Sequence, residues 1–236
     1  MKPLFRSKGS YNAMVIGSKP LIYFPMNDPS GLVAKNWGTL GVASDGAYTG
    51  VDLRNMPGPK GGSVPYFDGA NDFLNLYSAA MASAFNGNLG TLMVWIKART
   101  AGIWTDATTR YIAYLKVDSG NYLRFYKTTT DNQFIIARAA STHAEQISTT
   151  SMGGSTAWHC ILMHWDDAGT NEVKHYIDGS QVGSTIEAYT FVGSLASDQS
   201  LAGAGTSVPN YVWDGYLAHL ALWDRVLTPA EISMLA

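Results

Sequence analysis

The residues from Ala157 to Gly179 constrain the fold of this chain more than any other stretch. They contain two apolar segments, Trp158–Trp165 and Val173–Ile177, and the Asp/Gly/Asn-rich segment between them is typical of a turn. This pattern predicts a β-hairpin whose strands lie in the core. Cys160, the single cysteine, falls inside the first strand, so no intrachain disulfide can form and we expect a buried, unreactive thiol.

Other segments with strand patterns alternate with turn signals and predict an all-β, antiparallel protein. Apolar and polar residues alternate over 90–99, which predicts a half-buried strand. Further strands are expected at residues 20–26, 64–67, 72–77, 110–117, 122–127, 133–138 and 213–223. Because short turns connect the three segments within 110–138, these segments should form a meander.

Three further segments are expected to lie outside the strands. Residues 32–62 are rich in Gly, Asn and Pro and should form a long irregular loop. A short helix is expected at 79–85. The sequence Thr228-Pro229-Ala230-Glu231 combines a capping box with a proline at the first helical position, which predicts a helix at the C-terminal end.

Basic residues are concentrated at the start of the chain. Lys2, Arg6, Lys8 and Lys19 all precede the first acidic residue, Asp28. We therefore expect residues 1–19 to form a basic arm, solvated or docked on a partner, and residues 20–236 to form one domain. The net charge of −2 gives no electrostatic case for nucleic acid or a membrane as partner. The sequence shows neither a signal peptide nor a run of 18 apolar residues.

Four motifs resemble, in the same order along the chain, those of the laminin-G-like, concanavalin-A-like jelly-roll family. The hairpin is similar to the family's Trp-His-His strand and Tyr-Val-Asp-Gly turn. Residues 67–74 resemble its Phe-Asp-Gly-x-Asn-Asp-Tyr-Val segment, residues 90–97 its strand with Trp and Lys at matching places, and residues 213–235 its closing strand and helix. The resemblance implies a two-sheet antiparallel jelly-roll β-sandwich with a short C-terminal helix.

The resemblance also implies a calcium site in some relatives, and this chain departs from that pattern. Asn36 stands where the family often has an acidic residue, and Ala218-His219 replaces an Asp-Glu pair. Calcium binds several hard oxygen ligands, so the loss of these carboxylates weakens the expected site. No cofactor is expected, and a residual calcium site would use Asp28 or Asp214.

Some relatives are retaining glucanases, which use two nearby carboxyl groups, arranged there as Glu-x-Asp-x-Glu. Glutamate occurs only at Glu145, Glu172, Glu187 and Glu231, and none of the four begins such a motif. A Gly-x-Ser-x-Gly nucleophile motif is also missing. The sequence therefore predicts that the protein is not an enzyme, although it leaves open a catalytic pair of Asp residues from distant strands.

The histidines of the hairpin give no metal site by their spacing. His159 and His164 are five residues apart on one strand and therefore point to opposite faces of the sheet. We expect His159 to occupy a core position, and His164 and His175 to lie on strand surfaces.

Aromatic residues in or beside loops are candidates for stacking on sugar rings. These candidates are Trp37, Tyr48, Trp104, Tyr189, Tyr211 and Trp213. The alternative for each is that the ring only pins its loop to the sandwich.

The leading functional hypothesis is a non-catalytic structural or adhesion module on a larger assembly. A virion surface is the expected setting, as a capsid decoration, head-fibre or tail-associated protein, because a basic arm precedes a jelly roll that fills the rest of the chain. The second hypothesis is a lectin module that binds a cell-surface glycan, and the third is a glycoside hydrolase. A homo-oligomer is expected.

Overall fold

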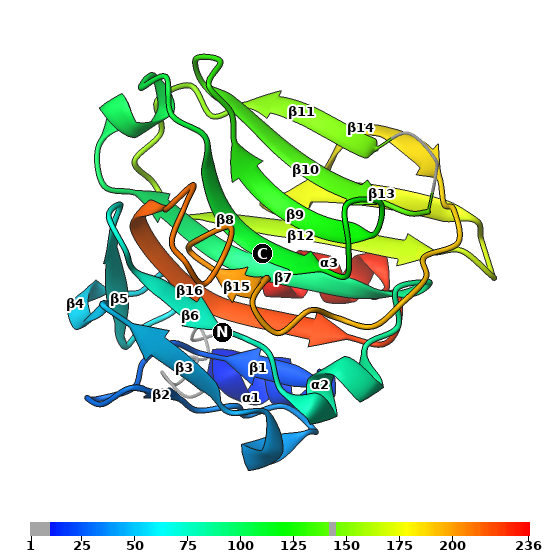
Figure 1. The fold of residues 1–236 in the computed structure, drawn as a ribbon, viewed down its shortest axis with the longest axis horizontal. Coiled ribbons are helices and arrows are strands. Elements are labelled where there is room, and N and C mark those ends of the chain that lie inside the picture. Colours follow the sequence, from blue (N-terminus) through cyan, green and yellow to red (C-terminus); the bar gives the residue numbers. More distant parts are fainter. Residues whose placement is uncertain (1–9, 142–144) are drawn as a thin grey trace, which may run out of the picture.

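The protein is an antiparallel β-sandwich, seen in a computed structural model that describes residues 10–141 and 145–236 (Figure 1). Two sheets of eight strands each pack face to face in this part of the chain, and three short α-helices lie outside them. None of these helices is long and apolar enough to cross a bilayer. The predicted all-β sandwich with a short C-terminal helix is confirmed.

The first sheet contains the hairpin and the closing strand. Its order is β14 (Ser180–Glu187), β13 (Glu172–Ile177), β12 (His159–Asp166), β7 (Leu89–Ala98), β16 (Asp214–Trp223), β5 (Ser63–Asp68) and β4 (Asp52–Pro57), with β1 (Ile22–Phe24) paired to β16. The predicted hairpin is β12 and β13, which pair from Ile161 opposite Ile177 to Asp166 opposite Glu172.

The second sheet contains the predicted meander. Its order is β11 (Gln146–Ser151), β10 (Gln133–Ala139), β9 (Tyr122–Lys127), β8 (Arg110–Lys116), β15 (Ser200–Ala202), β6 (Phe73–Asn75), β3 (Gly46–Thr49) and β2 (Val33–Ala34). The remaining elements are α1 (Ser10–Gly17), the 3₁₀ helix η1 (Gly41–Ser44), α2 (Ala79–Ala84), the 3₁₀ helix η2 (Ala101–Trp104) and α3 (Pro229–Leu235).

The hairpin strand β12 is buried on both faces of the first sheet. Ile161, Met163 and Trp165 point into the core between the sheets, whereas Cys160 and Leu162 belong to a second apolar cluster on the outer face. The ring of Trp165 lies so close to Gly90 on β7 that a Cβ atom there would meet it at 2.5 Å. The thiol of Cys160 is buried, as expected, and burial raises its pKa.

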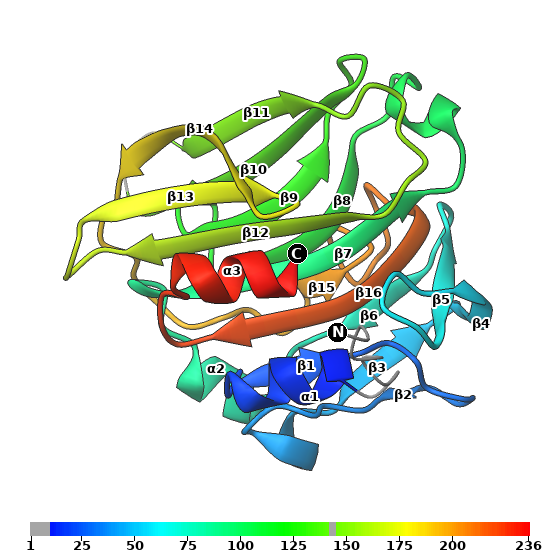
Figure 2. The same cartoon turned by 180° about the vertical axis from the view of Figure 1, so that it is seen from behind.

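Two helices cover the outer face of the first sheet, as Figure 2 shows for α1 and α3. Tyr11 of α1 links the two helices to the first sheet, because its hydroxyl donates to the carbonyl of Leu235 at 2.7 Å and accepts from the indole nitrogen of Trp95 at 2.9 Å. The strand β7 is therefore buried on both faces, and the prediction that it is half-buried is wrong.

The helix α1 lies within the segment that was expected to be a basic arm. Its residues Tyr11, Met14 and Val15 follow a helical spacing and contact the sandwich. Lys19, the basic residue of the arm that the structure describes, follows this helix with a φ of 57°. The other three, Lys2, Arg6 and Lys8, lie outside the described residues.

The predicted capping box at α3 is confirmed. The Thr228 hydroxyl accepts from the amide of Glu231, and the Glu231 carboxylate accepts from the amide of Thr228 at 2.8 Å. Arg225 also donates to this carboxylate, at 2.6 Å. These hydrogen bonds hold the pKa of Glu231 near 2, and Ile232 and Leu235 dock the helix on the sheet.

Residues 32–62 do not form the long loop that was predicted, because they contain β2, β3 and β4. Gly46 shows why composition misled here: a Cβ atom at this position would lie 2.9 Å from the carbonyl of Asn75 on the neighbouring strand. The glycine allows close sheet pairing and does not mark a turn.

His164 and His175 are buried, which corrects the prediction that they lie on strand surfaces. His159 was expected at a core position and is instead partly exposed, with its side chain 20% accessible and its ring directed to the Asp178 carboxylate. His175 is fully buried between the sheets, where its Nδ1 contacts the Ser148 hydroxyl of β11 at 2.7 Å. His164 is 4% exposed on the outer face of the first sheet. Burial lowers the pKa of His175 to about 3 and that of His164 to about 4.

The contact of α1 with the first sheet can be tested by paired substitutions. We expect Tyr11→Ala to lower the free energy of unfolding by about 3 kcal/mol, because it removes a buried ring and two hydrogen bonds. Ile16→Ala is the matched control, since Ile16 lies on the same helix and is 40% exposed, and its effect should stay within about 0.5 kcal/mol. If urea unfolding gave the same loss of stability for both variants, the helix would not pack as described.

Stability should fall as the pH drops from 7 to 5. Burial lowers the pKa of His175 and His219 to about 3, so the unfolded chain binds protons below pH ~6.5 that the folded chain does not bind. Each of these histidines should therefore cost about 2 kcal/mol of stability at pH 5.

His219→Asn is the variant that isolates one of these contributions. The φ of His219 is 50°, and Asn tolerates this left-handed conformation. Between pH 7 and pH 5, urea unfolding should show that the variant loses about 2 kcal/mol less free energy of unfolding than the wild type. An unchanged pH dependence would mean that His219 is protonated in the folded state near pH 6.

Candidate functional site

Tyrosines gather on the outer face of the second sheet, which α1 and α3 leave uncovered. On β9, Leu123 and Phe125 point into the core, so that Tyr122, Arg124 and Tyr126 point outward. Tyr111 and Tyr114 of the neighbouring strand β8 join the same cluster. We call these five outward residues, Tyr111, Tyr114, Tyr122, Arg124 and Tyr126, the tyrosine face.

A β-bulge brings the two tyrosines of β8 to the same side. The pairing of β8 with β9 shifts between Tyr111 and Ala113, and both Ile112 and Ala113 contact the core. The bulge therefore inserts one extra residue, so that positions three apart, Tyr111 and Tyr114, point outward together. Their rings meet edge to face, with centroids 5.1 Å apart.

Arg124 lies at the centre of the tyrosine face and holds its rings in place. Its guanidinium donates to the Tyr111 hydroxyl at 2.7 Å and lies over the Tyr126 ring, 4.3 Å from the centroid. Glu145 pairs with it at 2.7 Å. Burial, with the charge of Glu145 as the next cause, raises the pKa of Tyr122 to about 12. The phenol of Tyr122 is therefore neutral at physiological pH and keeps a hydroxyl hydrogen to donate.

Tyr211 extends the tyrosine face from the loop before β16. Its ring stacks on Tyr111 with centroids 5.1 Å apart and planes 23° apart, and its backbone carbonyl accepts from the Tyr111 amide at 2.6 Å. Gly205 fits beneath this pair, because a Cβ atom there would lie 3.1 Å from Tyr211 and 3.2 Å from Tyr111. Tyr211 is 50% exposed, so this packing presents a fixed aromatic ring to solvent.

Two hollows open beside Tyr211, and its ring lines both of them. The first, which we call the threonine hollow, measures about 380 Å³ and is lined by Gly69, Ala107, Thr108, Thr109, Arg110, Thr129, Tyr211 and Val212. The second, the glutamine hollow, measures about 200 Å³ and is lined by Tyr111, Tyr114, Lys116, Gln199, Gly205, Thr206, Asn210 and Tyr211.

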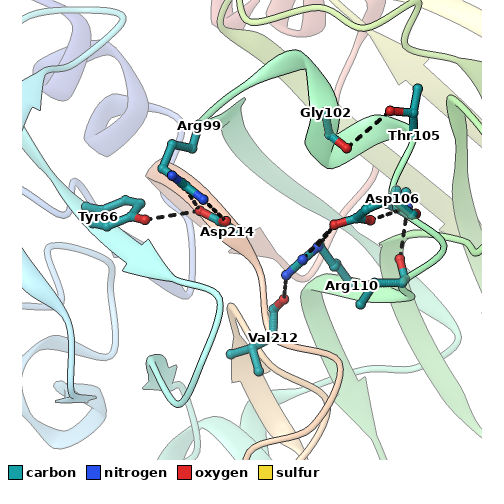
Figure 3. Close-up of polar contacts among 10 residues, drawn as sticks. Tyr66, Arg99, Gly102, Thr105, Asp106, Arg110, Val212 and Asp214 are labelled. Carbon is teal, nitrogen blue, oxygen red and sulfur yellow. Dashed lines mark hydrogen bonds and ion pairs between the residues drawn. The ribbon is translucent and has the colours of Figure 1, made fainter.

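Ion pairs fix the loops around the threonine hollow (Figure 3). Arg110 joins Asp106 at 2.7 Å and donates to the carbonyl of Val212 at 2.9 Å, which links η2 to the loop that carries Tyr211. Lys127, although fully buried, pairs with Asp106 at 2.6 Å. Burial alone would raise the pKa of Asp106, but hydrogen bonds from Arg110 and Lys127 outweigh it and lower the pKa.

The structure separates the aromatic residues that were predicted to stack on sugars. Trp104 and Trp213 are fully buried, with ring centroids 5.7 Å apart, and Tyr48 is 3% exposed. The prediction is corrected for these three residues, because buried rings pack inside the sandwich and offer no free face. Tyr211 is 50% exposed and Trp37 is 45% exposed, whereas Tyr189 is partly exposed.

The two predicted calcium ligands are occupied by donors from the protein. Asp214 forms two hydrogen bonds of 2.7 Å with Arg99 and accepts from the Tyr66 hydroxyl (Figure 3). Asp28 accepts from the Tyr48 hydroxyl at 3.0 Å. Within residues 10–141 and 145–236, no three His, Cys, Asp or Glu side chains come together as metal ligands. The two carboxylates therefore act as structural acceptors here.

Ser155, His159 and Asp178 form a hydrogen-bonded chain at the hairpin. His159 Nε2 lies 2.7 Å from the Ser155 hydroxyl, and its Nδ1 lies 2.7 Å from the Asp178 carboxylate. The same residue types form hydrolase triads. Here the Asp178 side chain is 48% exposed, and the backbone amide of Ala157 donates to the Ser155 oxygen at 3.2 Å. These contacts tie the β11–β12 loop to the hairpin.

Sequence reasoning missed all five residues of the tyrosine face, although it did predict their neighbour Tyr211 as a candidate. The signal was present, because Tyr122, Arg124 and Tyr126 alternate with Leu123 and Phe125. Outward positions of a strand at the surface are expected to be polar, so two aromatic rings at such positions indicate a packed aromatic cluster on that face.

Comparison with known proteins supports the fold and covers most of the chain. A sequence profile described as the concanavalin A-like lectin/glucanases superfamily matches residues 68–233. A comparison with curated protein sequences gives no match.

Three solved structures illustrate the similarity in fold. Domain 4 of the extracellular GH43 arabinanase AbnA from Geobacillus stearothermophilus, solved with arabinotriose, aligns with a TM-score of 0.62 and 17% identity over 92% of this chain and 98% of that one. The receptor-binding domain of botulinum neurotoxin C/D mosaic serotype gives 0.70 and 9% identity over 93% of this chain. Trypanosoma rangeli sialidase with sialic acid gives 0.63 and 13% identity over 94%.

This chain spans 51% of the neurotoxin domain and 33% of the sialidase chain. At these identities the likeness to solved structures concerns the fold alone. The profile match covers more than half of the residues, and together with the two-sheet architecture it shows that the chain belongs to the concanavalin A-like lectin/glucanase superfamily.

Proposed function

We propose that this protein is a non-catalytic carbohydrate-binding module and that Tyr211, beside the tyrosine face, is its main contact with the sugar. The observation that carries the proposal is the Tyr211 ring, which is 50% exposed, stacks on Tyr111 and belongs to the linings of two hollows. A flat ring fixed in this way matches the apolar face of a pyranose or furanose ring. Because the ring is already ordered, binding costs little side-chain entropy.

The groups that line the hollows suit a ligand rich in hydroxyls. The threonine hollow presents Thr108, Thr109 and Thr129, and the glutamine hollow presents Gln199 and Asn210. Hydroxyl and amide groups donate and accept hydrogen bonds, as sugar hydroxyls do. Arg110 at the threonine hollow shares its carboxylate partner, Asp106, with the buried Lys127.

The carboxyl groups around the tyrosine face support binding over hydrolysis. A glycosidase general acid needs a carboxyl group with a raised pKa, whereas the pKa of Asp106 is lowered by its cationic partners. Glu145 is paired with Arg124, and Asp214 with Arg99. Burial raises the pKa of Asp72, but this residue is 2% exposed and cannot reach a ligand on the surface.

The neighbours in fold agree with this class of ligand. The arabinanase domain was solved with arabinotriose and the sialidase with sialic acid. Arabino-oligosaccharides are accordingly among the first glycans to test, together with sialylated glycans.

Attachment to a virion or another large assembly stays a prediction. Three of the four basic residues on which it rests, Lys2, Arg6 and Lys8, lie outside the described residues. The helix α1 lies on the covered side of the first sheet, opposite the tyrosine face (Figure 2). An anchor on that side would leave the tyrosine face free to bind a glycan.

A glycan array with the wild-type protein and two variants tests the binding proposal. We expect Tyr211→Ala to weaken binding at least tenfold, because it removes the stacking ring at the centre of the site. Trp37→Ala is the matched control, since Trp37 is 45% exposed but lies in the segment between β2 and η1. It should bind like the wild type. An array without any bound glycan, or equal losses in both variants, would contradict the proposal.

A further inference from the structure

We infer that the ligand is a linear glycan bound through internal units of its chain, which crosses Tyr211 from the threonine hollow to the glutamine hollow. This inference rests on the proposed function and adds the shape of the ligand and the direction in which it lies. A module that recognises a single terminal sugar needs one closed hollow, whereas this site offers two open hollows that share Tyr211 in their linings.

The two hollows are neighbours that share one lining residue, Tyr211. The residues on either side of it in the chain line one hollow each, Val212 the threonine hollow and Asn210 the glutamine hollow. Because Tyr211 belongs to both linings, a chain that fills both hollows contacts this residue from each of them. The ring therefore contacts a middle unit, and the units before and after it occupy the hollows.

The ring that separates the hollows is held in a fixed position. Tyr211 has a φ of 52°, a conformation that non-glycine residues adopt only when their surroundings impose it. The stacking on Tyr111 and the close fit of Gly205 supply those surroundings. Arg110 adds a hydrogen bond to the next residue, Val212, from the floor of the threonine hollow. The distance and orientation between the two hollows are therefore fixed, which suits an extended ligand.

The floor of the threonine hollow limits how deep a sugar can lie. A Cβ atom at Gly69 would approach the Asp214 side chain at 2.9 Å and the Arg110 guanidinium at 3.1 Å. The backbone of Gly69 therefore lies close to these two ion-paired groups. A shallow floor of this kind admits a chain that lies along the surface and leaves its ends free.

Affinity electrophoresis and competition test the length of the bound segment. The probes are linear arabinan, linear xylan and mixed-linkage β-glucan, together with any linear glycan that the array retains. For each polymer that retards the protein, its disaccharide and its hexasaccharide compete for binding. We expect the hexasaccharide to compete at least tenfold better than the disaccharide, because only the longer chain occupies both hollows.

Substitutions that fill one hollow at a time test the path of the chain. We expect Ala107→Trp in the threonine hollow and Gln199→Trp in the glutamine hollow each to weaken hexasaccharide binding about tenfold. Val42→Trp is the matched control, since Val42 is 81% exposed in η1 and should change nothing. Unfolding midpoints of all variants establish that they are folded.

The outcomes separate this inference from the proposed function. If the disaccharide competes as well as the hexasaccharide, or if filling one hollow leaves binding unchanged, the protein binds sugar at a single subsite and the inference is wrong. If neither the array nor the polymers show binding, the proposed function fails and the inference fails with it.

Discussion

The contact that decides which surfaces of this molecule are free is the packing of α1 and α3 on the first sheet. Tyr11 joins the two helices to β7 through hydrogen bonds with Leu235 and Trp95. Once this face is covered, β7, β12 and β16 become central strands of a three-layer arrangement, and their outward residues are apolar. The helices leave the outer face of the second sheet uncovered, and the ring beside it that is well exposed is Tyr211, at 50%.

Buried ion pairs near η2 hold the loops beside this face in one conformation. A lysine as deeply buried as Lys127 is tolerated only because Asp106 and neighbouring carbonyls accept its hydrogen bonds. Loss of either partner would leave an unpaired charge in the interior, so the network holds its members in one geometry. Arg110 extends the network to the loop of Tyr211, and Arg124 has a comparable role among the tyrosines.

The fold could be predicted from the sequence wherever the local residue pattern favours the same element that the packing of the sandwich stabilises. The hairpin, the meander and the capping box at Thr228 each carry such a pattern. The strands β11, β14 and β15 were missed; β14 is an exposed edge strand, and its sequence SQVGSTIE shows no apolar alternation. The hollows beside Tyr211 arise from segments near residues 69, 107 and 205, and no local pattern shows that these segments meet.

Which individual aromatic rings are buried could not be predicted from the sequence either. Trp213 and Tyr211 are two residues apart in the same loop, yet the first lies in the core and the second is 50% exposed. The difference follows from the backbone at Tyr211, whose positive φ turns its ring out of the sandwich and onto Tyr111. The sugar binding that we propose depends on this one ring, because an ordered aromatic side chain can stack on a sugar without the help of a reactive group.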